Sequence, residues 1–187
     1  VINGGIRAAE ITMTTSGALQ ALEKLAGELG ERIVLGAGTV LDPETARACI
    51  LAGAQFIVTP TLRPATIEVA RRYSRVIIPG ALTPTEVLTA WEAGADMVKV
   101  FPCDNVGGPK YIKALKAPLP QVEMIPTGGV NLETAGAFLK AGACAVAVGS
   151  ELVDSASVRS GRFDVIEDRA RRFLEAIARA RAEMAAG

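Results

Sequence analysis

The chain has 187 residues, of which 50% are hydrophobic, 21% are charged and only 4% are aromatic. This length predicts one domain with an aliphatic core, and the composition excludes a disordered or collagen-like chain. Twenty basic residues balance twenty acidic residues, so a nucleic-acid groove is not expected. No apolar run is long enough to span a bilayer and the first residues show no secretion signal, which predicts a soluble, cytoplasmic protein.

The chain contains no histidine, and its cysteines Cys49, Cys103 and Cys144 are widely spaced. Histidine is the commonest general base near neutral pH and the commonest transition-metal ligand. Its absence excludes Ser-His-Asp, Cys-His and histidine-based zinc chemistry, and three isolated cysteines do not form a disulfide framework or a zinc site. Catalysis must therefore use Lys, Asp, Glu, Tyr, Cys or backbone groups, and we expect no metal and no cofactor.

Short, continuously apolar runs alternate with helical segments along most of the chain. Runs of this kind are buried on both faces, which is typical of parallel strands in an α/β protein. In chain order, the predicted strands cover residues 6–12, 33–35, 56–59, 76–79, 97–101, 122–126 and 144–148. Helical segments are predicted between them over residues 15–29, 43–52, 64–73, 84–93 and 132–141, and an amphipathic C-terminal helix over residues 163–185.

Local signals support this alternation. Prolines 43, 64 and 84 suit first helical turns, and the tripeptide Ala-Gly-Ala recurs around glycines 53, 94 and 142, where helices would end in left-handed caps. The opening residues around Gly4 resemble the end of such a helix. Seven visible strands plus one preceding strand would close a (β/α)₈ barrel. We therefore expect residues 1–187 to form a single barrel domain that lacks the first strand and helix.

Lys99 is the lysine that the pattern places inside a strand, in Met97-Val98-Lys99-Val100-Phe101. Burial of an ammonium group is costly and lowers its pKa, which makes the neutral amine available as a nucleophile near pH 7. The alternative is a structural lysine paired with a carboxylate. Its place near the carboxyl end of a predicted barrel strand, where barrel active sites lie, favours a catalytic role.

Glu10 is the acidic residue best placed to work with such a lysine. It follows Ala8 and Ala9 in the carboxyl half of the first predicted strand, whereas Asp96 and Glu123 lie near strand beginnings. A carboxyl group there could take and return protons for a carbinolamine or enamine. The alternative is a charge partner that merely keeps Lys99 ionised.

Two glycine motifs follow the last two predicted strands, one at Gly128-Gly129 and the other at Gly149-Ser150. Barrels frequently bind phosphate with the loops after their last two strands, although glycines also serve ordinary turns. Gly36-Ala37-Gly38-Thr39 resembles part of a dinucleotide fingerprint but lacks its third glycine and the following acid. We therefore do not expect NAD.

One ordered set of motifs runs from residue 4 to about residue 153: Glu10-Ile11-Thr12, Gly36-Ala37-Gly38-Thr39-Val40, Thr59-Pro60, Pro79-Gly80, Lys99-Val100-Phe101-Pro102 and Pro126-Thr127-Gly128-Gly129. Together these motifs resemble the 2-keto-3-deoxy-6-phosphogluconate (KDPG) and 4-hydroxy-2-oxoglutarate (KHG) aldolase family. The resemblance implies a trimeric (β/α)₈ barrel and a class I lyase of carbohydrate metabolism that cleaves a phosphorylated 2-keto-3-deoxy sugar acid to pyruvate and glyceraldehyde 3-phosphate.

The resemblance also implies roles for individual residues. Lys99 matches the Schiff-base lysine and Glu10 the general acid/base. Thr39 and Thr127 match positions that contact the pyruvyl group. The remaining substrate-binding positions are Thr59, Pro79 and Phe101, together with Gly128, Gly129, Gly149 and Ser150 at the phosphate end.

The sequence departs from the family at Thr14, where well-known members carry an arginine that holds anionic groups of the substrate. The family's first strand and helix have no counterpart before Val1. An alternative is therefore an aldolase-derived scaffold, an oligomeric building block whose catalytic residues persist without function. A phosphate-binding isomerase or flavin enzyme on a barrel would keep the glycine loops but leave Lys99 unexplained.

Overall fold

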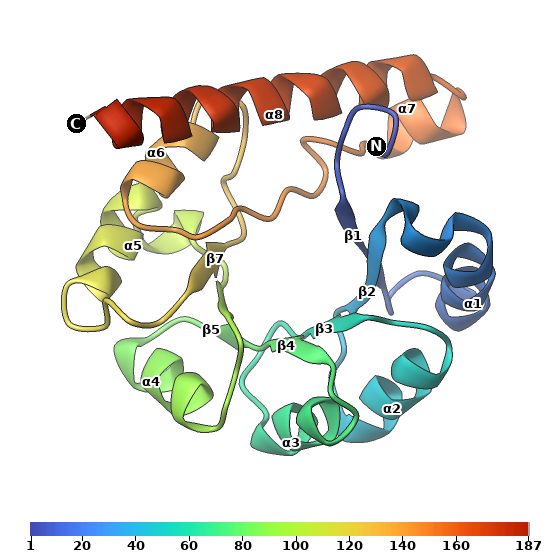
Figure 1. Ribbon diagram of the computed structural model, residues 1–187, viewed down its shortest axis with the longest axis horizontal. Coiled ribbons are helices and arrows are strands. Elements are labelled where there is room, and N and C mark those ends of the chain that lie inside the picture. The colour runs from blue at the N-terminus through green and yellow to red at the C-terminus, as the bar shows by residue number, and fades with distance from the viewer. Residues whose placement is uncertain (187) are drawn as a thin grey trace. The chain divides into compact units, whose positions relative to one another are not determined.

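The computed structural model describes residues 1–186, which fall into two units. One unit is Arg7–Lys99, and the other combines Val1–Ile6 with the chain from Val100 onward. Strands and helices alternate along Arg7–Lys99, whereas the chain from Val100 onward ends in consecutive helices, as Figure 1 shows along the colour gradient. The expected domain boundary at Gly187 lies outside the described residues.

The first unit contains a four-stranded parallel sheet in sequential order. Helices α1, α2 and α3 lie on one side of these strands (Figure 1). The strands are β1 (Ala8–Thr12), β2 (Val34–Gly38), β3 (Phe56–Val58) and β4 (Val76–Ile78), followed by the short β5 (Gly80–Ala81). The helices are α1 (Ala18–Leu29), α2 (Pro43–Leu51), α3 (Pro64–Arg72) and α4 (Pro84–Glu92), with a 3₁₀ turn at Gly30–Arg32.

The two faces of this sheet differ in character. Leu35, Ala37, Ile57 and Ile77 share one face and are at most 4% exposed. Side chains alternate along a strand, and the register pairs Glu10 with Gly36 and Gly36 with Phe56. Glu10, Gly36, Gly38 and Phe56 therefore share the opposite face.

Helix starts in this unit follow the expected local chemistry. The Asp42 carboxylate accepts a hydrogen bond from the Thr45 backbone N–H at 2.6 Å, ahead of Pro43 in the first turn of α2. Thr83 and Glu86 form a reciprocal capping box at the start of α4. The predicted glycine caps are also confirmed, because Gly53 and Gly94 follow α2 and α4 with φ angles of 103° and 91°.

The strand β6 (Val98–Val100) spans the boundary between the units, with Lys99 in the first and Val100 in the second. In the second unit, the Thr127 backbone N–H donates to the Val100 carbonyl at 3.0 Å, beside β7 (Met124–Pro126). The helices of this unit are α5 (Pro109–Lys116), α6 (Ala135–Lys140), α7 (Ser155–Arg159) and α8 (Phe163–Ala186), with a 3₁₀ turn at Asp104–Val106.

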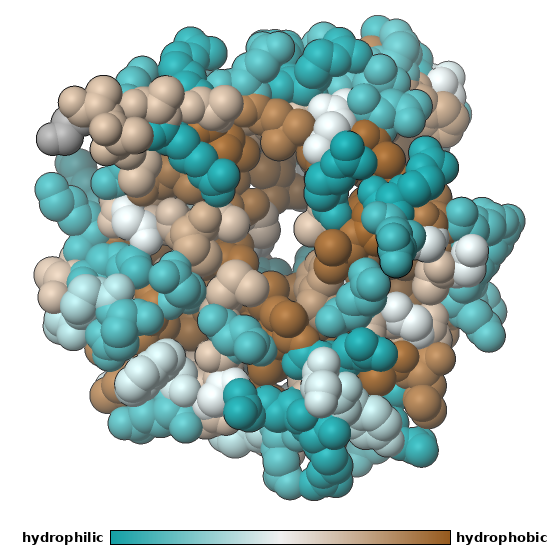
Figure 2. Space-filling view, in the orientation of Figure 1, coloured by the Kyte–Doolittle hydropathy of each residue, from teal (hydrophilic) through white to brown (hydrophobic). Residues whose placement is uncertain are grey.

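Helix α8 lies along α6 and beside α7 (Figure 1). Ile166, Ala170, Phe173 and Ala180 are buried on its inner face, and hydrophilic residues follow most of its outer edge in Figure 2. The N-terminal loop packs against the same helix, because a Cβ atom at Gly4 would lie 2.5 Å from the Ala170 Cβ.

Two sequence-based expectations need correction. Residues 144–148 do not form a strand but make an isolated parallel bridge between Ala147 and Thr127. The partner strand β7 is only three residues long, which leaves little backbone for a ladder. Helix α1 begins at Ala18 rather than at residue 15, because Gly17 adopts a left-handed conformation with φ 71°.

No helix within residues 1–186 combines the length and the apolar character that crossing a membrane requires.

Candidate active site

Lys99 lies in the middle of β6 and is only 8% exposed. Its backbone N–H donates to the Pro79 carbonyl at 2.9 Å, which fixes the strand beside the start of β5. The neighbouring residues Val98 and Val100 are almost fully buried. Lys99 is therefore a largely buried lysine within a strand, as the sequence pattern predicted.

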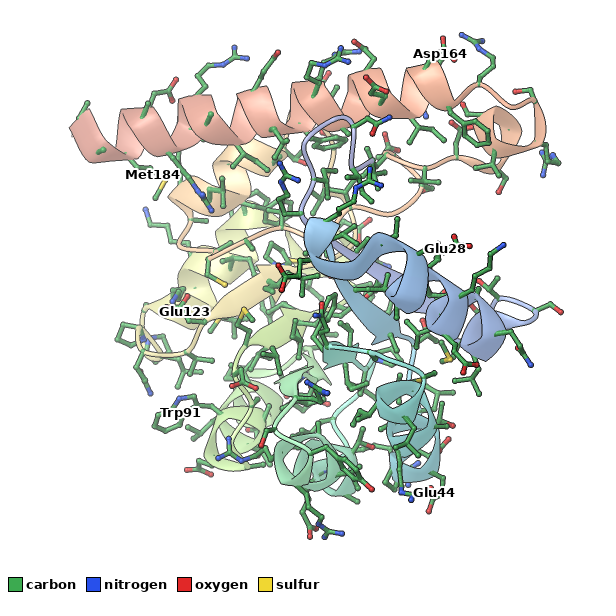
Figure 3. All side chains as sticks on the ribbon, turned by 45° about the vertical axis from the view of Figure 1, so that its right-hand side comes forward. Glu28, Glu44, Trp91, Glu123, Asp164 and Met184 are labelled. Atoms are coloured by element: carbon green, nitrogen blue, oxygen red, sulfur yellow. The ribbon has the colours of Figure 1, made fainter. Side chains whose placement is uncertain are left out.

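Glu10 lies in the centre of β1, partly buried, in the same unit as Lys99. Other acidic residues of this unit behave differently: Glu28 and Glu44 are exposed on helices and point away from the strands (Figure 3). Lys99 and Glu10 are close enough for the charge of each to shift the pKa of the other, so the structure brings together the two side chains that the sequence singled out for chemistry.

The electrostatics of Glu10 and Lys99 are coupled. Burial raises the pKa of the Glu10 carboxyl, and the positive charge of Lys99 offsets part of this rise. Burial lowers the pKa of the Lys99 ammonium, and the negative charge of Glu10 offsets part of this fall. Both shifts favour the neutral forms, a free amine and a protonated carboxyl, which are the forms that nucleophilic attack and proton donation require.

Thr39 follows β2 directly and has a φ angle of 54°. A β-branched residue in the left-handed region is strained by about 1–3 kcal/mol, and such strain persists where the surrounding structure holds it in place. Thr39 lines a cavity of about 440 Å³ with Met13, Thr14 and Asp42, at the ends of β1 and β2. Neither Glu10 nor Lys99 lines this cavity. The sequence analysis singled out Thr14 but did not predict the cavity.

Thr59 is 1% exposed and its hydroxyl is engaged within the protein. It donates to the Thr61 carbonyl at 2.5 Å and accepts from the Gly80 backbone N–H at 3.2 Å. These bonds join the loop after β3 to the start of β5, next to Pro79. Thr59 and Pro79 thus shape the backbone around Lys99.

In the second unit, Thr127, Gly128 and Gly129 form a tight turn after β7. The Thr127 hydroxyl is buried and has no hydrogen-bond partner within residues 1–186. Gly128 and Gly129 have φ angles of 93° and 70° and lie against Asp104, whose Cβ would be 2.5 Å from a Cβ atom at Gly129. The sequence patterns did not single out Asp104. The feature that could have pointed to it is an acidic residue shortly after the strand that contains Lys99.

Gly149 and Ser150 are exposed in the same unit. The bridge between Thr127 and Ala147 brings their loop next to the Gly128-Gly129 turn. In the described part of the chain, the backbone N–H groups of Gly129, Gly149 and Ser150 donate no hydrogen bond. A Cβ atom at Gly149 would meet nothing within 4 Å, so this loop leaves open space.

Phe101, at the end of β6, is 37% exposed.

No group of three or more His, Cys, Asp or Glu side chains within residues 1–186 is arranged to hold a metal ion. The buried amine of Lys99 and the adjacent Glu10 carboxyl can together form an imine with a carbonyl compound and move protons beside it.

Comparison with known proteins identifies the family. The family model described as KDPG and KHG aldolase matches residues 1–169. The 2-dehydro-3-deoxy-6-phosphogalactonate aldolase of Escherichia coli (strain K12) is 39% identical over 153 residues, which cover 81% of this chain and 74% of that protein.

Solved structures agree with this match. The structure described as native KDPGal has a TM-score of 0.89 and 35% identity, covering 96% of this chain and 85% of that one. The KDPG aldolase of Legionella pneumophila, with pyruvate captured as a covalent carbinolamine intermediate, has a TM-score of 0.85 and 28% identity, covering 90% and 82%. The expected fold class, the barrel of class I aldolases, is therefore confirmed. The chain belongs to the KDPG and KHG aldolase family and is a carbon–carbon lyase.

Proposed function

We propose that this protein is a Schiff-base aldolase that cleaves 2-keto-3-deoxy-6-phosphogluconate, or a closely related 2-keto-3-deoxy sugar acid, to pyruvate and glyceraldehyde 3-phosphate. The observation that carries the proposal is Lys99, a lysine 8% exposed within a strand and electrostatically coupled to Glu10. The pyruvate carbinolamine captured in the Legionella pneumophila enzyme supports the same chemistry.

The first half of the reaction builds an electron sink. The neutral Lys99 Nζ attacks the C2 carbonyl of the substrate, and the resulting carbinolamine loses water to give an iminium ion. Glu10 supplies the proton that converts the carbinolamine hydroxyl into the departing water. The positive iminium nitrogen can then accept an electron pair from the neighbouring carbon–carbon bond.

The second half of the reaction breaks that bond and releases the two products. The Glu10 carboxylate takes the proton of the C4 hydroxyl, the C3–C4 bond breaks, and its electrons form an enamine on Lys99 while the aldehyde leaves. Glu10 returns the proton to C3. Water then hydrolyses the iminium to release pyruvate and the neutral Lys99 amine, and the proton set free in this step returns to the Glu10 carboxylate. Protons and electrons balance without a metal or cofactor.

The Gly128-Gly129 turn and the Gly149-Ser150 loop are proposed as the anion end of the site. Unpaired backbone N–H groups of Gly129, Gly149 and Ser150 are suitable donors for phosphate oxygens. The buried, unpartnered Thr127 hydroxyl is proposed to hold an oxygen of the pyruvyl group, because a polar atom buried without a partner is costly. Thr39 and Phe101 complete the proposed substrate-binding set, together with Thr59 and Pro79, whose proposed part is to hold the backbone around Lys99.

Two further parts belong to the proposal: a homotrimeric assembly, which the resemblance supports, and a cytoplasmic location, which the sequence pattern predicted. Sedimentation of the purified chain measures the first of these, with a mass three times that of one chain as the expected result.

Trapping with pyruvate and borohydride tests the proposed function. Reduction of the imine should leave a stable adduct on the peptide that contains Lys99, and Lys99→Ala should abolish both the adduct and cleavage. Lys24→Ala is the matched control, because Lys24 is exposed on α1 with 72% side-chain exposure. Circular dichroism should verify that each variant is folded. A folded chain without label at Lys99 would instead support the scaffold alternative.

A further inference from the structure

Gly38, the last residue of β2, lies against the carboxyl group of Glu10. A Cβ atom at Gly38 would be 2.5 Å from Glu10 Cδ, 2.5 Å from Oε1 and 2.9 Å from Oε2. All three distances are shorter than real Cβ contacts allow. The space that a side chain would take at this position is therefore filled by the carboxyl group of the proposed general acid/base.

Position 38 needs a glycine because a side chain there would overlap with the Glu10 carboxyl group, and not because of its backbone conformation. Gly38 is not among the glycines with a positive φ angle, so its backbone accepts an L-residue without strain. Glycine in a strand often marks a place where another group approaches closely. Gly38 fits that description, and the approaching group is the Glu10 carboxyl.

Gly38 differs from the other glycines of these strands that have no positive φ angle. A Cβ atom at Gly36 would lie 2.4 Å from the Phe56 ring, and one at Gly80 would lie 2.2 Å from the Pro60 backbone carbon. Those two glycines make room for a rigid ring and for main chain. The closest atoms to a Cβ at Gly38 all belong to the flexible end of one side chain.

The backbone of Gly38 is held on its β1 side. Gly38 pairs with Thr12 in the parallel ladder, and its carbonyl accepts a hydrogen bond from the Met13 N–H at 2.8 Å. The next residue, Thr39, is held in the left-handed region. An added methyl group is therefore accommodated by movement of the Glu10 carboxyl rather than by movement of the strand.

We propose that Gly38 is a positioning residue that seats the Glu10 carboxyl beside Lys99 for proton transfer. The inference rests on the proposed role of Glu10 and assigns the Gly36-Ala37-Gly38-Thr39 segment a function unrelated to nucleotide binding. Because the displaced atoms are the end of a flexible side chain, Gly38→Ala should fold normally and lose proton transfer specifically.

The test uses pyruvate alone, so it does not depend on the identity of the sugar acid. Exchange of the pyruvate methyl protons for deuterium, followed by NMR, requires both the imine on Lys99 and proton transfer. Gly38→Ala should slow this exchange by about 10²-fold, while borohydride trapping at Lys99 persists. Gly27→Ala is the matched control, because a Cβ atom there meets nothing within 4 Å, and its exchange rate should be unchanged.

A double-mutant cycle separates positioning from a general structural effect. In the Glu10→Gln background the proton carrier is already absent, so adding Gly38→Ala should change the exchange rate less than twofold. An equal loss in both backgrounds, or wild-type exchange in Gly38→Ala, would overturn the inference and leave the proposed function intact. Absence of exchange in the unmodified chain would overturn the proposed function, and this inference with it.

Discussion

Lys99 of β6 and Glu10 of β1 lie in one unit, close enough for the charge of each to act on the other. Their pKa values move toward each other, because burial lowers that of Lys99 and raises that of Glu10. These shifts make the neutral Lys99 amine more available for attack and the protonated Glu10 carboxyl more available for proton donation. The sequence indicated Lys99 directly, since a lysine in an apolar strand is unusual. The sequence also singled out Glu10 from its place in the carboxyl half of a strand, and the fold adds that its charge acts on Lys99.

The substitution Glu10→Gln tests whether the Glu10 carboxyl carries protons during the reaction. The amide keeps the volume of the carboxyl but cannot carry the proton, so turnover should fall by about 10²–10⁴-fold. Imine trapping at Lys99 should continue at a reduced rate. Steady-state cleavage assays and borohydride labelling of the same preparation measure both effects. Full cleavage activity in this variant would contradict the role of Glu10.

The same variant should alter the pH dependence of labelling. Attack requires the neutral amine, so labelling increases as pH rises through the pKa of Lys99. The Glu10 carboxylate raises that pKa; its removal should therefore move the midpoint of labelling to lower pH. Labelling rates measured across a pH series check the direction, and a shift to higher pH would contradict it.

At the scale of single elements, the glycine loops of the second unit differ in what they can tolerate. Gly129 has a positive φ angle and lies against Asp104, so substitution there would disturb the turn itself. Gly149 has open space around the position of a Cβ atom. It is therefore the better probe of an anion at this loop.

Gly149→Ala should raise the KM for a phosphorylated substrate while leaving the KM for pyruvate exchange unchanged. The added methyl group would occupy space beside the N–H groups proposed to hold phosphate, and it meets no protein atom within 4 Å. Steady-state kinetics with both substrates measure the difference. Equal effects on the two KM values would contradict a phosphate end at this loop.

Helix α8 permits a matched test of packing. Phe173 is 2% exposed and Phe163, in the same helix, is 64% exposed. Phe173→Ala should reduce the free energy of unfolding by about 3–5 kcal/mol, whereas Phe163→Ala should change it by about 0.5 kcal/mol or less. Urea denaturation followed by circular dichroism measures both. Equal losses would show that α8 does not pack through its predicted apolar face.

At the scale of the whole molecule, the sequence predicts a single domain, and the structure groups the chain into two units. Trp91, the one tryptophan of the chain, belongs to the first unit and points outward from α4 (Figure 3). Its fluorescence reports that unit, whereas far-UV circular dichroism reports the helices of both. For a single domain the two urea transitions should coincide. Separate midpoints would identify two independently unfolding domains.

The sequence by itself determined the alternation of strands and helices, the prolines at helix starts, the glycine caps and the family. These features depend on residue type and short spacing, which the chain carries locally. The tertiary structure decided that Glu10 lies beside Lys99, that Gly38 leaves room for its carboxyl, and that residues 144–148 form only a bridge. Each of these depends on which distant segments pack together, and local sequence patterns do not specify contacts between residues far apart in the chain.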